Sequence, residues 1–528
     1  PITVYAPQIT VNQALSSTGG LTLNGASVLN GGSISTTGAQ AYNGAVTLGA
    51  ATVLTSTGSG AITFGSTLDG ARTLAVNTSG ATTFTGAVGG TTALSSLSTD
   101  AGGTVAINGG AVTTTGAQTY NDALSLGANT ALTASTVTFG STVQGTGSLA
   151  VTGAATLNGG SVTTVGAQTY NGTVSLGADT TLTAPTVTFN GAVTGAGFLS
   201  VQGASSLNGG SVSTAGTQTY SGAVTLGAAT TLASTSSGDI TFGSTINGAQ
   251  TLAVNTSGAT TFTGAVGGTT ALTSLSTDAG GTVAINGGAI NTTGLQSYGE
   301  AATLGAATVL TSTGSGAITF GNTLNGAQTL AVNTSGATTF TGAVGGTIAL
   351  TSLSTDAGGT VAINGGVVNT TGAQSFSDAA TLGADTTLTS TGSGAITFGS
   401  TLNGAQALAV STSGITTFGG AVGGTTALTS VTTDAGGSVV ISGGSVHTTG
   451  AQTYNDAVNL GAATTLQGVN VALMSTVDGA QALTLSDSGT TVLGGILGGS
   501  TPLLSLTTDS PTTAAGETQL KAGSIHVT

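Results

Sequence analysis

The chain contains almost no charged residues and no cysteine. Of its 528 residues, two are Lys or Arg and sixteen are Asp or Glu, which gives a formal net charge of −14. A protein that binds nucleic acid needs cations to meet the phosphates, and Arg72 and Lys521 are the only two in the sequence. The same shortage argues against docking on an anionic membrane. The absence of Cys excludes disulfides, cysteine-based zinc sites and thiol catalysis.

Other absences narrow the fold class. The sequence has no run of about 18 apolar residues, so no segment is predicted to cross a bilayer as a helix. Glycine fills 92 positions without recurring at every third one, which excludes collagen. With 38% hydrophobic residues, the chain is too apolar for simple disorder. It begins at Pro1 without a basic and then apolar leader, so we expect a mature product or an excised piece.

What the chain does contain is an internal repeat. Successive copies begin 78 or 50 residues apart. The phrase Gly-Ala-Gln-Thr-Tyr-Asn and its near copies start at Gly38, Gly116, Gly166, Gly216, Gly294, Gly372 and Gly450. Within one 78-residue unit, bulky residues recur at Tyr298, Phe320, Phe340, Ile363 and Phe376, and the last step is clearly shorter than the three before it. A beat of about 20 residues, with whole sub-repeats gained or lost, is typical of a stacked coil.

The local pattern indicates strands. Stretches such as 317–320 and 329–332 alternate large apolar residues with small or polar ones, which is the period of a β-strand. Turn-forming Ser-Gly, Asn-Gly and Gly-Gly pairs separate them, and no helical heptad recurs. We therefore predict an all-β fold, a single elongated parallel β-helix (β-solenoid) with about 20 residues per turn and essentially no α-helix. The short step from Ile363 to Phe376 predicts that the aromatic residue moves there to a different wall.

This fold predicts internal stacks and three regions. Phe320 and Phe340 should stack in neighbouring turns, with Tyr298 and Ile363 extending the stack. Residues 1–37 are predicted to form N-terminal solenoid turns and residues 38–449 the repeat array. Residues 450–528 are predicted to form a degenerate C-terminal repeat unit.

Two phrases carry a resemblance to a known family. The sequences Gly-Ser-Gly-Ala-Ile-Thr-Phe-Gly at 314–321 and Thr-Asp-Ala-Gly-Gly at 355–359 resemble repeats of filamentous-haemagglutinin-like adhesins, which are large bacterial exoproteins. The similarity covers residues 38 to 508 and concerns composition and rhythm rather than a catalytic motif. It implies the shaft region of such a protein, with a right-handed parallel β-helix that is secreted and often attached to the cell surface.

Acidic residues recur at one phase of the long repeat, and they permit two interpretations. The set is Asp100, Asp278, Asp356, Asp434 and Asp509. One hypothesis is a column of carboxylates that binds Ca²⁺. Asp278, Asp356 and Asp434 lie 78 residues apart, which is about four turns or roughly 20 Å, so they cannot share one ion. The favoured interpretation is an Asp-Ala-Gly-Gly turn in which the carboxylate bonds its own backbone.

Two amide series have the same ambiguity between ligand contact and structural role. Asn-Gly pairs recur at Asn108, Asn158, Asn208, Asn286 and Asn364. We interpret them as turn residues that tolerate positive φ. A glutamine recurs beside the aromatic residue at Gln118, Gln168, Gln218, Gln296, Gln374 and Gln452. These residues could line a sugar-binding surface, but a structural turn amide or hydrogen-bond ladder is favoured.

No catalytic constellation is apparent. His447 and His526 are too few for a metal site or a triad, and His447 takes a place held elsewhere by Thr or Ser, so we expect it to be an exposed substitution. A hydrolase needs two carboxylates about 5 to 10 Å apart, and a pair such as Asp378 with Asp385 is replaced in sister units. We predict that the protein is not an enzyme, with no catalytic, cofactor-binding or metal-binding residues and no cofactor.

These observations predict a structural protein. We expect a rigid extracellular solenoid, either a shaft or a filament subunit of a bacterial adhesin or matrix fibre, outside the cell or on its surface. Self-association end to end or laterally is expected, without nucleic-acid partners or membrane insertion. The alternative is a carbohydrate- or surface-binding adhesin region that contacts host or matrix surfaces and glycans. An ice-binding solenoid or a polysaccharide-active enzyme is less favoured, because the Thr rows are irregular and basic residues are nearly absent.

Overall fold

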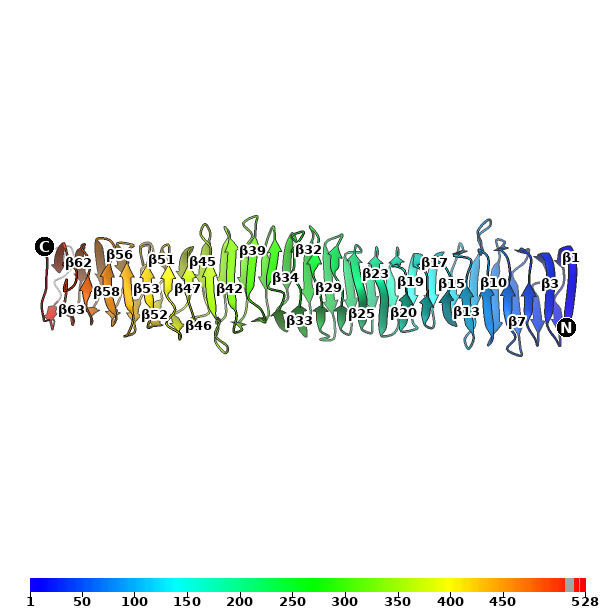
Figure 1. Cartoon of the computed structure of the whole chain (residues 1–528), viewed down its shortest axis with the longest axis horizontal. Helices are drawn as coiled ribbons and strands as arrows, with labels where there is room; N and C mark the ends of the chain where they lie inside the picture. The colour runs from blue at the N-terminus through cyan, green and yellow to red at the C-terminus, as the bar shows by residue number, and fades with distance from the viewer. Residues whose placement is uncertain (509–516, 522) are drawn as a thin grey trace. The chain divides into compact units, whose positions relative to one another are not determined.

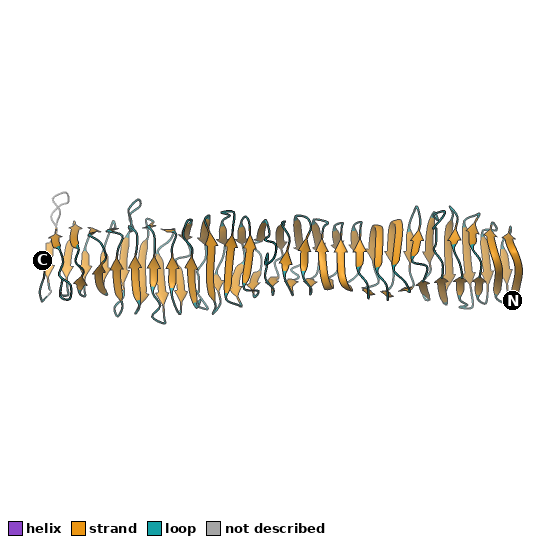
Figure 2. Cartoon of the chain, turned by 45° about the horizontal axis from the view of Figure 1, so that its top comes forward, coloured by secondary structure: helices purple, strands orange, loops and turns teal. Residues whose placement is uncertain are grey.

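The structure, a computed structural model, describes residues 1–508, 517–521 and 523–528. The chain divides into two compact units, Pro1–Gly258 and Ala259–Thr528. Within each unit short strands follow one another and lie side by side with those of the neighbouring turns (Figure 1). These described residues include strands and turns but no helix (Figure 2). The prediction of a parallel β-solenoid is thus confirmed, whereas its hand and the three predicted regions stay predictions.

Each turn consists of three strand segments, and these form the three walls of a unit. Two successive turns of the first unit contain β5 (Gln40–Tyr42), β6 (Val46–Leu48) and β7 (Thr52–Ser56), then β8 (Ile62–Phe64), β9 (Leu68–Asp69) and β10 (Thr73–Thr78). Every segment pairs in parallel with its counterpart one turn later: β5 with β8, β6 with β9 and β7 with β10. Alternate side chains point inward, which explains the period-2 pattern of the sequence.

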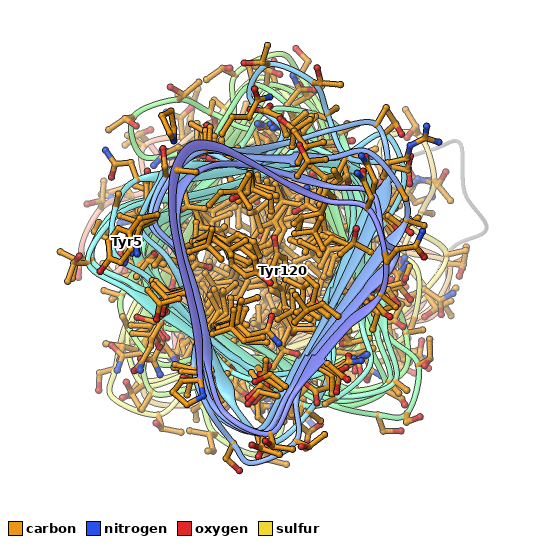
Figure 3. All side chains as sticks on the ribbon, turned by 90° about the vertical axis from the view of Figure 1, so that its right-hand side faces the viewer. Tyr5 and Tyr120 are labelled. Atoms are coloured by element: carbon orange, nitrogen blue, oxygen red, sulfur yellow. The ribbon has the colours of Figure 1, made fainter. Side chains whose placement is uncertain are left out.

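Inward side chains of successive turns stand above one another and form the core. In the second unit, Tyr298, Phe320 and Phe340 occupy paired positions, with ring centroids 5.1 and 5.6 Å apart. Ile363 continues this column, as the sequence predicts. The ring spacing follows from the distance of about 4.8 Å between neighbouring strands. In the first unit, seen end-on in Figure 3, Tyr120 lies inside the coil, whereas Tyr5 points outward and is 81% exposed.

The 78-residue repeat is not a whole number of turns. The column of Tyr298 runs through Ile363 to Leu382, whereas Phe376, the sequence equivalent of Tyr298, pairs with Thr355 on another wall. The three steps from Tyr298 to Ile363 are therefore full turns, whereas the short step from Ile363 to Phe376 crosses two walls only. One long repeat thus spans three and two-thirds turns. The predicted change of wall is confirmed, and each new copy begins one wall earlier than the last.

The first unit follows the same rule with both repeat lengths. The chain of paired strands that starts at β5 leads to β27 (Gln218–Tyr220), so these two copies share a wall. The copies between them, β15 (Gln118–Tyr120) and β21 (Gln168–Tyr170), lie on the other two walls. A 50-residue repeat spans two and two-thirds turns, one turn fewer than the long repeat. Three successive repeats therefore return the phrase to its original wall.

Removal of one stacked ring should destabilise the fold far more than removal of an outward neighbour. Phe320 is 1% exposed and contacts a ring on both sides, so Phe320→Ala should cost about 3 to 5 kcal/mol through lost burial and a cavity. Thr319→Ala, on the outward side of the same strand β40 (Ile318–Phe320), should cost under about 0.5 kcal/mol. Denaturant unfolding, with hydrogen exchange to locate the change, measures both. Equal losses would contradict the inward assignment of Phe320.

Candidate functional sites

The glutamines beside the aromatic residue lie inside the solenoid. Gln118 donates from Nε2 to the carbonyl oxygens of Val112, at 2.9 Å, and of Thr133 in the next turn, at 3.0 Å. Its Oε1 accepts a hydrogen bond from the Tyr120 hydroxyl at 3.0 Å. Both side chains are 0% exposed, and burial raises the pKa of Tyr120. The structural role favoured for these glutamines is confirmed, although they bond backbone carbonyls and Tyr rather than one another, and a sugar-binding surface made of them is excluded because they are buried.

The recurring Asn-Gly pairs have a different geometry from the predicted one. Asn108 does not adopt positive φ; that conformation belongs to Gly110, the second glycine of Asn-Gly-Gly, with φ of 75°. The equivalent Gly160 has φ of 77°. The Asn108 side chain lies over the next turn, where a Cβ added at Gly127 would come within 2.1 Å of Asn108 Oδ1. The turn role stands, but the prediction of positive φ at Asn was wrong.

The recurring Asp residues cap the backbone of the preceding turn. Asp100 Oδ1 accepts a hydrogen bond from the backbone N–H of Thr78 at 2.9 Å, 22 residues earlier. Asp356 and Asp434 accept the equivalent bonds at 2.9 and 3.0 Å. These carboxylates therefore have a structural role. The sequence predicts that each carboxylate bonds the backbone of its own turn, but its partner is a backbone N–H of the preceding turn. Asp509 lies outside the described residues.

Each described member of this series has a second acid nearby, one turn later. These acids are Asp122, Glu300, Asp378 and Asp456, which follow Asp100, Asp278, Asp356 and Asp434 respectively. Asp122 is 2% exposed; its Oδ1 accepts the backbone N–H of Gly103 at 2.6 Å, and its Oδ2 has no partner. Burial raises the pKa of Asp122, the Gly103 hydrogen bond lowers it, the charge of Asp100 raises it, and the nearby Thr99 hydroxyl lowers it; burial outweighs the rest and the pKa is raised. The sequence signal that could have revealed these pairs is an offset of one turn.

Two carboxyl groups approach each other at Glu300. Glu300 is 1% exposed, and no neighbouring N–H or hydroxyl group donates to its carboxyl oxygens or to Asp278 Oδ1. Burial, followed by the hydrogen bond with Asp278 and the charge of that residue, raises the pKa of Glu300 to about 8. Because a hydrogen bond between two carboxyl groups requires a proton on one of them, this pair holds a proton near neutral pH.

A further buried acid, Asp487, shows how this chain satisfies a carboxylate completely. Asp487 is 0% exposed and accepts four hydrogen bonds of 2.8 to 3.0 Å, three from backbone N–H groups and one from the hydroxyl of Thr491. Burial alone would raise the pKa of Asp487, but these hydrogen bonds outweigh burial and lower it. The local sequence around Asp487 gives no sign of this role, because two of its four donors, the N–H groups of Asn470 and Val471, belong to the preceding turn.

The remaining candidate residues do not converge. His447 is half-buried rather than fully exposed, and His526 Nε2 lies 3.0 Å from the Ser524 hydroxyl. Asp378 is buried and accepts the N–H of Gly359, whereas Asp385 is exposed and accepts that of Ala407. These two carboxylates therefore serve different turns. In the described part of the chain no three His, Asp or Glu side chains gather closely enough to hold a metal ion by themselves.

The two basic residues do not complete a site either. Arg72 and Lys521 are both exposed. Exposure to solvent gives neither cation a fixed position beside the buried acids described above.

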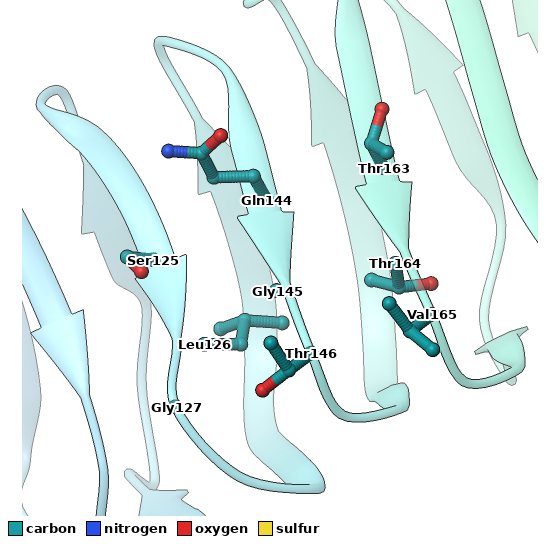
Figure 4. Close-up of a pocket in the computed structure, with 9 residues that line it drawn as sticks. All are labelled: Ser125, Leu126, Gly127, Gln144, Gly145, Thr146, Thr163, Thr164 and Val165. Atoms are coloured by element: carbon teal, nitrogen blue, oxygen red, sulfur yellow. The ribbon is translucent and has the colours of Figure 1, made fainter.

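The surface of the first unit has a shallow hollow where a glycine interrupts a wall. It measures about 410 Å³ and is centred on Gly145, between Leu126 and Thr164 of the adjacent turns, with Val165 and Gln144 at its rim (Figure 4). The nine residues that line it include no acid, base or aromatic ring. The hollow thus offers neither acid–base chemistry nor a stacking surface.

Comparisons with family models, with curated proteins and with solved structures gave no match to this chain. Within residues 1–508, 517–521 and 523–528, no helix is long and apolar enough to span a membrane.

The raised pKa of Glu300 predicts a pH-dependent stability. Between the unfolded pKa of 4.5 and the folded value of about 8, the folded chain holds a proton that the unfolded chain has released. Stability should therefore fall as the pH rises through this window. Glu300→Gln should reduce the fall in unfolding midpoint between pH 5 and pH 8, measured in a chelating buffer. Glu517→Gln, at an exposed position, should leave it unchanged; an unchanged slope in the Glu300 variant would refute the shared proton.

Proposed function

We propose that the chain is a mechanical element, a rigid extracellular shaft or filament subunit of a bacterial adhesin or matrix fibre. The observation that carries this proposal is the passage of one sequence phrase from wall to wall within each unit. Since successive copies occupy three walls in turn, no wall accumulates a distinct set of side chains. Such a solenoid resists bending equally in every direction, which suits a spacer better than a binding surface.

The interior supports a load-bearing role. Every turn is bonded to the next by parallel backbone hydrogen bonds, and Gln side chains such as Gln118 tie successive turns at the corners. Stacked rings fill the space between the walls. A turn cannot move without breaking bonds to both of its neighbours, because each contacts the turns before and after it.

The outer surface supports a location outside the cell. Only 3% of the residues are charged, so the surface is mainly Thr, Ser, Gly and Ala. Arg72 and Lys521 are the sole cleavage positions for trypsin-like proteases in the sequence. The resemblance of the repeats to those of filamentous-haemagglutinin-like adhesins favours a secreted bacterial product. Weak charge repulsion also favours lateral or end-to-end self-association of such solenoids.

The alternative, a carbohydrate-binding region, has less support. Sugars are commonly held against exposed aromatic rings, and the Tyr and Phe rings of the repeats are buried, apart from the half-buried Phe198. Within the described residues, Tyr5 is the single Tyr or Phe that is fully exposed. The repeats therefore present hydroxyl groups to a sugar but no fully exposed aromatic ring.

Negative-stain microscopy of the purified chain over a concentration series tests the proposal. We expect straight, stiff particles. A particle length that grows with concentration would identify a filament subunit, and a constant length would identify a spacer. Flexible threads or globular particles would refute the mechanical function.

A further inference from the structure

The corner next to the recurring aromatic residue occurs once per repeat, and three positions at it change together from repeat to repeat. In four repeats these positions hold a threonine and an aspartate in one turn and, in the next turn, an acid two residues after the aromatic residue. These sets are Thr99, Asp100 and Asp122; Thr277, Asp278 and Glu300; Thr355, Asp356 and Asp378; and Thr433, Asp434 and Asp456. At the other three corners the sets are Leu23, Asn24 and Gly44; Val151, Thr152 and Gly172; and Val201, Gln202 and Gly222. A buried hydroxyl and two carboxylates thus occur together or not at all.

Space alone does not explain this pattern. At a corner without the acids, a Cβ added at Gly172 would come within 2.2 Å of the carbonyl oxygen of Gly153, so glycine is required there. The corners with the acids have space for a side chain, but space alone does not explain why that side chain is acidic. An asparagine would cap Gly103 as well as Asp122 does, without placing a charge near Asp100. The recurrence of two acids facing each other needs a further cause.

At three corners one carboxylate oxygen and one hydroxyl have no well-formed hydrogen bond. Asp122 Oδ2 and Thr99 Oγ1 are both buried; the Thr99 hydroxyl faces the carboxylate and lowers the pKa of Asp122, but the two atoms do not reach hydrogen-bond geometry. The same two atoms are unpartnered at Thr355 and Asp378 and at Thr433 and Asp456. Asp487, which is equally buried, has four donors. The chain can therefore satisfy a buried carboxylate, yet it leaves these oxygens open.

We propose that each of the four corners binds one Ca²⁺ ion, which bridges two successive turns. Each corner offers oxygens from two carboxylates and a hydroxyl, which is the donor type that a hard cation prefers. At three corners the open atoms are the hydroxyl and one oxygen of the buried acid, because Asp100, Asp356 and Asp434 each accept a backbone N–H. A cation also offsets the repulsion between each buried acid and its half-buried Asp neighbour, and at Glu300 it would take the place of the shared proton. This inference does not depend on the proposed mechanical function, since it rests on the corner atoms alone.

The geometry also sets the strength and placement of the ions. Two carboxylates and a hydroxyl are an incomplete shell, so backbone oxygens and water must supply the remaining ligands. Such sites belong to the class with dissociation constants of about 10⁻⁴ to 10⁻³ M. In the second unit, the corners next to Tyr298, Phe376 and Tyr454 lie on three different walls. Calcium would thus tie that unit together on every side.

Calorimetric titration of the whole chain with CaCl₂ at neutral pH tests the proposal. We expect about four ions per chain for the wild type. The variant with Asp122→Asn, Glu300→Gln, Asp378→Asn and Asp456→Asn keeps the side-chain shapes and should lose at least tenfold in affinity. The control carries Asp69→Asn, Asp179→Asn, Asp385→Asn and Asp478→Asn, which removes the same four charges from outward positions, and should bind as the wild type does. Equal binding by both variants, or no binding by the wild type at 10 mM, would overturn the proposal.

The corners without acids supply a second test, in which one calcium site is converted to the sequence of a corner that lacks it. Thr99→Val with Asp122→Gly converts the first corner to the pattern of Val151 and Gly172, and should lower the number of bound ions from four to three. Tb³⁺ gives an independent signal, because Tyr120, Tyr298 and Tyr454 each lie two residues before a corner acid and can sensitise the emission of an ion bound there. A partial loss of tyrosine-sensitised emission in this variant, with the signal from the other two corners retained, supports the site. An unchanged emission and stoichiometry would refute it at this corner.

Discussion

The register between successive turns is the constraint on which the rest of the structure depends. Each inward residue must lie above an inward residue of the turn before it, because the strand segments of a wall pair in parallel and in register. The register shifts where a long strand continues from one wall to the next, as between Thr133 and Thr136. The aromatic columns follow directly, since a ring stacks well only on another flat or bulky side chain. The hydrogen bonds of the buried glutamines follow as well, because the amide of Gln118 donates to backbone carbonyls of its own turn and of the next turn. Residues about 20 apart in sequence are thus the true neighbours.

The same constraint explains how repeats of two lengths coexist in one chain. A turn can be added or removed wherever the new neighbours present the same inward pattern. The three walls are similar enough that the phrase around Tyr120 fits each of them, so a repeat need not close on a whole turn. A repeat of three and two-thirds turns, or of two and two-thirds, is therefore stable and distributes its surface features evenly around the unit.

Much of this architecture could be predicted from the sequence, and the exceptions have a common cause. The stack of Phe320 on Phe340 and the strand class follow from local alternation and spacing, which a sequence displays directly. The partner of Asp100 and the pairing of Asp278 with Glu300 depend on which residues the register brings together across turns, and this was not apparent from motifs within one turn. Asn108 was assigned the wrong φ because the following glycines can take the strained conformation instead.

The most direct test of the register is disulfide formation between introduced cysteines, since the natural chain has none to interfere. Ser354 and Ser375 are paired across adjacent turns, so their Cα atoms should lie about 4.8 Å apart, within the range for a disulfide. Ala362 and Ser375 would be paired if the repeat closed on whole turns, but here they lie on different walls. Mild oxidation should therefore cross-link Ser354→Cys with Ser375→Cys and leave Ala362→Cys with Ser375→Cys reduced. The reverse result would contradict the account.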